Sequence, residues 1–227
     1  MSTLPTDFYS HHARRYAQVA HEFIQSVYSH VSHPGLTSDF AIIDRLRQVV
    51  PVGARGLDAG CGAGARAVFF YCRDGYDMVG IHVVEENIAV ALELHPELSD
   101  RVSVADLGKP LPFPDASLDF VLCNAVIQHI ERDKVMGVTL PEFARVLKVG
   151  GVLQLMQKVG SGVTTVFDRD YGVERSFRLY EADEVVERLR ALGLDVVPQE
   201  GDELGGVMYF TDPKPVDHSL FYARKVR

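Results

Sequence analysis

The residues with the clearest chemical signature form a glycine-rich run between an apolar segment and a helical pattern. The run GLDAGCGAG spans residues 56–64 and places Gly60, Gly62 and Gly64 two residues apart, with Asp58 two residues ahead of them. Because glycine has no Cβ, such a loop turns sharply and lets a ligand lie against the backbone, near the N–H groups of the following helix. Glycines also serve ordinary turns and close packing, so the run favours a ligand-binding turn without establishing one.

Histidine is the second residue type here that could do chemistry. His129 follows an apolar run at 118–123, where an imidazole could accept a proton from a hydroxyl or an amine. A histidine that bonds the backbone at a helix start fits this position equally well. His30 and His33 are one helical step apart, but no cysteine or acidic residue completes a ligand set, so we expect no metal.

The hydrophobic pattern predicts two helices before the glycine run. Apolar residues recur at three- and four-residue steps from Phe8 to Val31, which indicates an amphipathic helix that ends at residues 33–35, His-Pro-Gly. A second helix is predicted from Ser38 as its N-cap to the residue before Pro51.

From the glycine run onward, short apolar runs alternate with helical patterns. This alternation indicates strand–helix–strand units, which close into a parallel sheet with helices on both faces. The tail adds a surface helix and two further strands. Strands are predicted at 56–57, 78–81, 102–104, 118–123, 152–156, 207–210 and 219–223, and helices at 65–73, 85–94, 141–147 and 182–192.

Length and composition exclude several classes of protein. The chain has 227 residues, 47% of them hydrophobic, which suits one domain with little disorder. A net charge of −8 argues against nucleic acid and anionic membranes as partners. Three cysteines without a CxxC pair fit neither a disulfide framework nor a zinc ribbon. We see no signal peptide and no apolar run long enough to span a membrane, so we expect a cytoplasmic protein.

Four segments resemble, in order, the motifs of one enzyme family. LDAGCGAG (57–64) resembles its motif I, and Asp106-Leu107 followed by LPFPDASLDFV (111–121) is similar to its "D…LPFPDxSFDxV" segment. Gln128-His129 resembles its "HH" element, and RVLKVGG (145–151) is close to its "RxLKPGG" turn. These are motifs of the class I S-adenosylmethionine (SAM)-dependent methyltransferases, in particular the small-molecule type 11 branch that includes the ubiquinone and menaquinone methyltransferases.

The resemblance implies a Rossmann-like α/β fold. Its mostly parallel sheet would have seven strands with helices on both faces, and its last strand would insert antiparallel. We expect a single methyltransferase domain over residues 1–227. Within it, the resemblance suggests an N-terminal helical lid at 1–50, a SAM-binding core at 51–156 and acceptor-side elements at 157–227.

The resemblance also implies where SAM, and its product S-adenosylhomocysteine, would lie. Asp58 would fix the glycine loop and the ligand's amino group, while Asp106 and the N–H of Leu107 would serve the adenine. Asn124 would offer its carbonyl to the methionine ammonium. Alternatively, Asp106 is a helix cap and Asn124 a turn residue. The residues expected at the cofactor are Tyr16, Asp58, Gly60, Cys61, Gly62, Gly64, His82, Val83, Asp106, Leu107 and Asn124.

Two residues depart from the family pattern. His82 stands where the family carries an acidic residue that accepts hydrogen bonds from both ribose hydroxyls. Neutral imidazole has only one acceptor, so we expect His82 to hold the ribose with one accepted bond fewer, unless Glu85 takes over. Gly56 replaces an aliphatic residue in a strand, which usually marks the close approach of another element.

The predicted function is methyl transfer to an oxygen or nitrogen atom of a small, partly aromatic acceptor. His129 is the candidate base, and Tyr9 and Tyr16, in a segment similar to the family's "FYDxxAxxY" lid, either cover the cofactor or are core aromatics. We expect no nucleic-acid partner, no membrane insertion, and a monomer or homodimer. The alternatives are a SAM-binding protein without methyl transfer, a non-methylating enzyme such as a cyclase, and an NAD(P)-dependent oxidoreductase.

Overall fold

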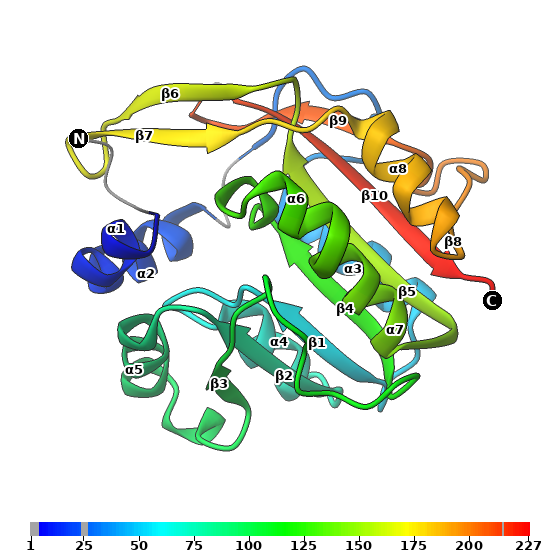
Figure 1. The fold of residues 1–227 in the computed structure, drawn as a ribbon, viewed down its shortest axis with the longest axis horizontal. Coiled ribbons are helices and arrows are strands. Elements are labelled where there is room, and N and C mark those ends of the chain that lie inside the picture. The colour runs from blue at the N-terminus through cyan, green and yellow to red at the C-terminus, as the bar shows by residue number, and fades with distance from the viewer. Residues whose placement is uncertain (1–4, 24–26, 215) are drawn as a thin grey trace.

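The structure is a computed structural model that describes residues 5–23, 27–214 and 216–227 (Figure 1). Its main sheet comprises β1 (Arg55–Ala59), β2 (Asp77–His82), β3 (Val102–Val104), β4 (Leu118–Asn124), β5 (Leu147–Lys158), β8 (Leu194–Val196), β9 (Met208–Thr211) and β10 (Asp217–Lys225). The strand order is β3-β2-β1-β4-β5-β10-β8, with β9 paired to β10. Strands β1 to β5 are parallel along this path, whereas β10 is antiparallel to β5, β8 and β9.

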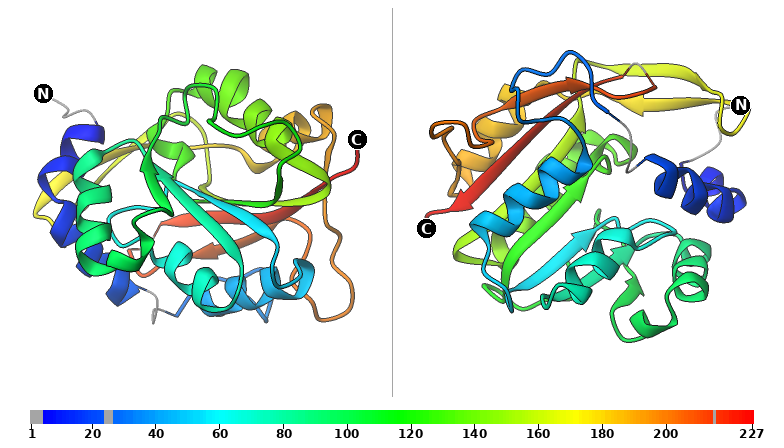
Figure 2. Two further views of the ribbon diagram at one scale, coloured as in Figure 1. Left: turned by 90° about the horizontal axis from the view of Figure 1, so that it is seen from below. Right: turned by 180° about the vertical axis from the view of Figure 1, so that it is seen from behind.

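Helices cover both faces of this sheet. They are α1 (Pro5–His11), α2 (Ala13–Phe23), α3 (Asp39–Val49), α4 (Arg66–Arg73), α5 (Glu85–Leu94), α6 (Arg132–Lys134), α7 (Leu140–Val146) and α8 (Ala182–Ala191), with short helical turns at Pro96–Leu98, Ile127–His129 and Val135–Thr139. Leu46 of α3 and Tyr71 of α4 belong to the buried cluster on one face of the sheet. The right-hand view of Figure 2 shows the helices on this face. Phe143 of α7 and Leu189 of α8 belong to the cluster on the other face. This is the layered arrangement in which parallel strands are buried on both sides.

The predicted architecture is confirmed in its central part. Each of the five strands predicted between residues 56 and 156 lies inside an observed strand, and the helix predicted at 85–94 coincides with α5. The path has seven strands, and β10, the last strand in the sequence, is inserted antiparallel beside β5, as expected. The sheet differs from the expectation by an eighth strand, β9, which pairs with the first half of β10.

The prediction of one helix from Phe8 to Val31 is wrong. The helix is broken at His12 into α1 and α2, and residues 24–26 lie outside the described residues. Residues 27–31 are not helical, because Ser29 forms a backbone bridge with Thr211 instead, its N–H donating to the Thr211 carbonyl at 3.0 Å. The expected lid at 1–50 is also too long, because α3 packs into the core and only α1 and α2 lie beside the strand ends (Figure 1).

A two-stranded hairpin was not predicted. Strands β6 (Val163–Asp168) and β7 (Val173–Arg178) pair antiparallel with each other and form a sheet of their own. Figure 1 shows this hairpin extending above α1 and α2. The lid helices and the hairpin therefore stand on the same side of the molecule, although about 150 residues separate them in the sequence.

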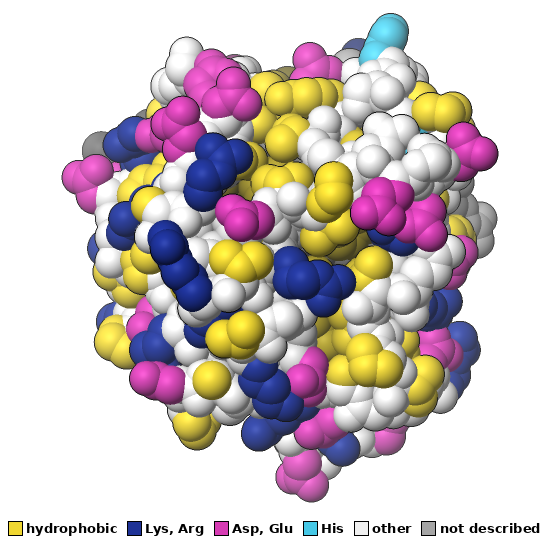
Figure 3. Space-filling view, turned by 90° about the vertical axis from the view of Figure 1, so that its right-hand side faces the viewer, with side chains coloured by type: hydrophobic (Ala, Val, Ile, Leu, Met, Phe, Trp, Pro, Cys, Tyr) yellow, Lys and Arg dark blue, Asp and Glu magenta, His cyan; other side chains and the backbone are white. Residues whose placement is uncertain are grey.

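The outer surface of the molecule is mixed in character. Acidic, basic and hydrophobic side chains are interspersed over the face shown in Figure 3, the pattern of a solvated surface. Among the helices of the described residues, none has the length and apolar composition needed to cross a bilayer.

Gly56 in β1 is explained by its neighbour Phe120 in β4. A Cβ built on Gly56 would lie 2.2 Å from Cζ of Phe120, whose side chain is fully buried. The Phe120 ring therefore occupies the space above the strand that an aliphatic residue would need. This is the close approach that a glycine inside a strand indicates.

We expect Gly56→Ala to lower the free energy of unfolding by about 1–3 kcal/mol, the usual range for overpacking a core. The double variant Gly56→Ala/Phe120→Leu makes room for the methyl group, so its two substitutions interact favourably in a double-mutant cycle. Urea unfolding measures both. Gly137→Ala is the matched control, because its Cβ would meet nothing within 4 Å. Strictly additive effects of Gly56→Ala and Phe120→Leu would contradict this explanation.

Candidate functional site

Two adjoining cavities open beside the carboxyl ends of the parallel strands. The larger has a volume of about 770 Å³ and the smaller about 90 Å³. Four residues line both cavities, namely Tyr9, Tyr16, Ala125 and His129. Open α/β sheets bind ligands at this edge, so the small and large cavities form one candidate site with a shared wall.

The glycine loop follows β1 and forms part of the small cavity. Gly60 and Gly62 have φ angles of +105° and +66°, a region that favours glycine. The N–H groups of Gly60 and Cys61 both donate to the Ile81 carbonyl at 2.9 and 3.0 Å, so they fix the loop to β2. Nothing lies within 4 Å of a Cβ built on Gly64. The loop thus turns as the sequence predicts, but two of its N–H groups are used within the protein.

The lid lies directly on this loop. A Cβ built on Gly62 would come within 3.0 Å of the Tyr16 ring, and Tyr9 packs edge-on against Tyr16 with 4.9 Å between ring centroids. Tyr9 belongs to α1 and Tyr16 to α2, and the hydrophobic face of these helices packs against the site. Tyr9 is buried, Tyr16 is half-buried, and both line the two cavities, so their position fits either of the two roles that the sequence left open.

His82 closes the far end of the small cavity at the end of β2. Its Nδ1 accepts the N–H of Val84 at 3.1 Å, so the ring proton is on Nε2. Burial lowers the pKa of His82 to about 4, so the ring is neutral. Val83 also lines this cavity, whereas Glu85 is exposed and does not. The alternative in which Glu85 replaces the family carboxylate therefore has no support.

Asp106 and Leu107 follow β3, which pairs with the end of β2 at His82. Both line the small cavity. Asp106 Oδ1 accepts the N–H of Gly108 at 2.8 Å, which is a turn-capping bond, and its other oxygen lies 3.7 Å from Lys109. Asp106 therefore caps a local turn while it borders the cavity.

Asp58 and Asn124 lie at the ends of β1 and β4. Burial raises the pKa of Asp58 to about 7, partly offset by the positive charge of Arg66. Asn124 lines the large cavity, and its Oδ1 accepts a hydrogen bond from Gln154 Nε2 at 2.9 Å. The Oε1 of Gln154 is buried and has no hydrogen-bond partner within the described chain. This free acceptor suits a ligand that donates hydrogen bonds, such as an ammonium group.

His129 stands at the junction of the two cavities in a chain of hydrogen bonds. Arg175 Nη2 donates to Tyr9 Oη at 2.5 Å, and the Tyr9 hydroxyl, 3.0 Å from His129 Nε2, donates to this nitrogen. Burial and the nearby positive charges of Arg175 and Lys158 lower the pKa of His129 to about 3. The ring is neutral, and its acceptor nitrogen is already engaged by Tyr9.

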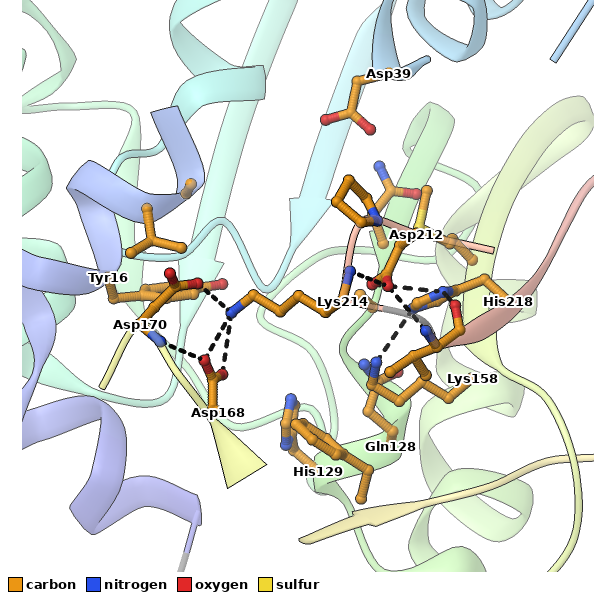
Figure 4. A pocket seen from close by; sticks show the side chains of 18 of the residues that line it. Tyr16, Asp39, Gln128, His129, Lys158, Asp168, Asp170, Asp212, Lys214 and His218 are labelled. Carbon is orange, nitrogen blue, oxygen red and sulfur yellow. Dashed lines mark hydrogen bonds and ion pairs between the residues drawn. The ribbon is translucent and has the colours of Figure 1, made fainter. Parts of the chain in front are cut away.

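The large cavity is lined by elements of the expected acceptor side at 157–227, but the sequence analysis singled out none of the polar side chains there. They lie at the end of β5, on the hairpin and near β10, and Figure 4 shows several of them facing one another. Polar residues inside the otherwise apolar end of β5 (LQLMQK, 153–158) were a signal for part of this set. Gln128, named with His129 in the family motif, lines this cavity too, and the residues not singled out are Gln154, Lys158, Asp168, Arg175, Asp212, Lys214 and His218. No group of three His, Cys, Asp or Glu side chains in the described ranges is arranged to hold a metal ion.

Comparisons with known proteins agree with this geometry. A family model described as a methyltransferase domain matches residues 57–155. The chain is 32% identical over 135 residues to 2-methyl-6-phytyl-1,4-hydroquinone methyltransferase from Synechocystis, covering 60% of this chain and 39% of that protein. It is 30% identical over 154 residues to 27-O-demethylrifamycin SV methyltransferase from Amycolatopsis mediterranei, covering 57% of this chain and 55% of that protein. The alignments thus span well under two thirds of these curated relatives.

A solved structure shares the fold over nearly the whole chain. The [4+2]-cyclase SpnF superposes with a TM-score of 0.67 at 21% identity, over 99% of each chain. At this level of identity the likeness concerns the fold alone.

Asp58 gives the site a pH-dependent stability. Its native pKa of about 7 exceeds the usual value of 3.8, so the folded protein keeps a proton that the unfolded chain releases. Stability is therefore lost as the pH rises from about 4 to about 7. The Asp58→Asn side chain cannot ionise. We therefore expect the free energy of unfolding of this variant, relative to that of the wild type, to rise by roughly 2–4 kcal/mol between pH 4 and pH 8.

Urea unfolding between pH 4 and pH 8 measures this effect. Asp119→Asn is the control, because bonds from Lys148 and the Arg55 N–H leave the pKa of Asp119 lowered despite partial burial. Its carboxylate is ionised in both the folded and the unfolded state above about pH 4, so the stability difference between this variant and the wild type stays nearly constant from pH 4 to pH 8. Parallel curves for Asp58→Asn and the wild type would contradict the buried position of Asp58.

Proposed function

We propose that this chain, whose residues 57–155 match the model of a methyltransferase domain, is a class I SAM-dependent methyltransferase that methylates an oxygen or nitrogen atom of a small, partly aromatic acceptor. The observation that carries the proposal is the junction of the two cavities at Tyr9, Tyr16, Ala125 and His129. A methyl donor with its adenosine in the small cavity would extend through this junction and meet an acceptor in the large cavity. The expectation of a cytoplasmic monomer or homodimer stands beside it as a prediction.

The residues around the small cavity fit SAM. We assign the adenosine to the space between His82, Val83, Asp106 and Leu107 at the ends of β2 and β3. The open face of Gly64 and the unpaired Oε1 of Gln154 suit the methionine end, whose ammonium donates hydrogen bonds. Bound SAM supplies a methyl group activated by its sulfonium, and the departing thioether needs no acid.

The chain's own task is alignment and the exclusion of water. Tyr9 and Tyr16 cover the junction, and the bonds Arg175–Tyr9–His129 hold this cover to the hairpin and to the turn after β4. We propose that His129 touches the reacting groups and orients Tyr9. A role for His129 as base would require the Tyr9 hydroxyl to leave its Nε2.

Radiolabelled SAM tests the proposed function. We expect the purified protein, incubated with labelled SAM and the small molecules of a cell extract, to transfer label into small organic products, and excess S-adenosylhomocysteine to suppress it. Binding of S-adenosylhomocysteine without label transfer would support a non-methylating SAM-binding protein or a cyclase. Binding of NADH without SAM would support an oxidoreductase. Either result would overturn the proposal.

His82 permits a sharper test of the cofactor site. Because Nδ1 of His82 accepts the Val84 N–H, the ring offers the ribose at most one donor, the Nε2–H, which lies 3.4 Å from Asn87 Nδ2, whereas a carboxylate accepts from both hydroxyls. We expect His82→Asp to tighten S-adenosylhomocysteine binding by up to about fivefold, the value of one ordinary hydrogen bond. Calorimetry measures the dissociation constant. His82→Asn, which keeps one donor and one acceptor, is the control, and weaker binding by His82→Asp would contradict this assignment.

A further inference from the structure

The large cavity holds one buried basic side chain that no carboxylate of the described residues neutralises. Arg175 bonds Asp168 at 2.8 Å, and Lys214 bonds Asp168 and Asp170 at 2.9 and 2.6 Å. These bases are therefore already paired. Lys158, 6% exposed, forms no ion pair within 4.0 Å with any described Asp or Glu side chain.

His218 and Phe177 hold the Lys158 ammonium in place. His218 Nδ1 donates to the Val216 carbonyl at 3.0 Å, so its Nε2 carries a lone pair that accepts from Lys158 Nζ at 3.3 Å (Figure 4). The same Nζ lies 4.6 Å from the centroid of the Phe177 ring, a favourable cation–π distance. An ammonium has three N–H donors, and His218 uses one, so donors remain for a ligand in the cavity.

Asp212 is the acidic group that most favours the charged form of Lys158. Its Oδ1 accepts the N–H groups of Lys214 and Val216, and its Oδ2 lies 3.9 Å from His218 Nδ1. Burial lowers the pKa of Lys158 to about 8, with Arg175 and Lys214 adding repulsion and Asp212 and Asp168 opposing the shift. The ammonium thus predominates at neutral pH, but its burial is costly, and an anion in the cavity would relieve that cost.

Neither histidine beside the cavity is an effective base in this arrangement. His129 Nε2 accepts the Tyr9 hydroxyl, and His218 Nε2 accepts Lys158. Burial lowers the pKa of both imidazoles to about 3, so they take up a proton poorly near pH 7. A neutral hydroxyl acceptor would need such a base, whereas an acceptor that binds as an oxyanion needs none.

We propose that the acceptor is a planar aromatic or conjugated molecule bearing an oxyanion, and that Lys158, positioned by His218, binds this oxyanion. Phe177, Phe210 and Tyr171 line the same cavity, so its wall has the aromatic character that suits such a ring. The inference rests on the proposed function, because it names the acceptor class of that site.

The probe for the test is 4-nitrophenol, whose phenolate absorbs visible light. It is titrated between pH 5 and pH 9 with wild-type protein, with and without saturating S-adenosylhomocysteine. We expect bound 4-nitrophenol to ionise roughly one pH unit or more below the free phenol, since a tenfold preference for the phenolate equals one unit. The neutral 4-nitroanisole serves as the uncharged probe.

The matched variants are Lys158→Gln and Lys214→Gln, two bases of the same wall. Lys158→Gln should abolish the shift and weaken phenolate binding roughly ten- to hundredfold, as loss of one charged hydrogen bond does. It should leave the binding of 4-nitroanisole and S-adenosylhomocysteine unchanged. Lys214→Gln, whose lysine is already paired, should change phenolate binding much less.

Two results would overturn the inference. One is an unshifted ionisation of 4-nitrophenol on the wild-type protein, which depends on no variant folding correctly. The other is equal phenolate binding by the wild type and Lys158→Gln. Failure of S-adenosylhomocysteine to bind would count against the proposed function instead, and the titration without it would still decide the role of Lys158.

Discussion

The site depends on the parallel pairing of β1 between β2 and β4. This pairing brings the ends of the three strands to one edge, so the glycine loop, His82 and Asn124 meet although they are far apart in sequence. The central strands are buried on both faces, and Gly56 lets the Phe120 ring fill the space above β1. Without that close packing the strands would not hold the loop that turns at Gly60 and Gly62.

Burial sets the charge state of nearly every ionisable group in the site. His82, His129 and His218 are neutral because their surroundings exclude water, and the same cause moves the pKa values of Asp58 and Lys158 toward neutral pH. A methyl donor carries a positive charge that is lost on transfer. A wall of neutral imidazoles with one buried cation suits an acceptor that brings its own negative charge.

The sequence predicted the central fold well because period and glycine placement are local signals. The strands from residue 56 to 156 and the turn at Gly60 follow from patterns within a few residues. The break after α2 was missed because the bridge between Ser29 and Thr211 is a contact across the chain. The elements at the large cavity were expected from the family resemblance, but the contacts among their polar side chains were not, because the neighbours of Lys158 come from β7 and β10 and no local pattern pairs them.

Arg175 connects two elements that are far apart in the sequence, the hairpin and the lid helix α1. From the hairpin it bonds Tyr9 of α1 and packs over the rings of Phe8 and Phe177, at 4.2 and 4.9 Å from their centroids. The Arg175 guanidinium thus connects the lid helix α1 to the hairpin where both cavities meet. A ligand that enters or leaves past α1 would have to break these contacts of Arg175. The dissociation rates of the proposed cofactor and acceptor would then depend on the same opening of the lid.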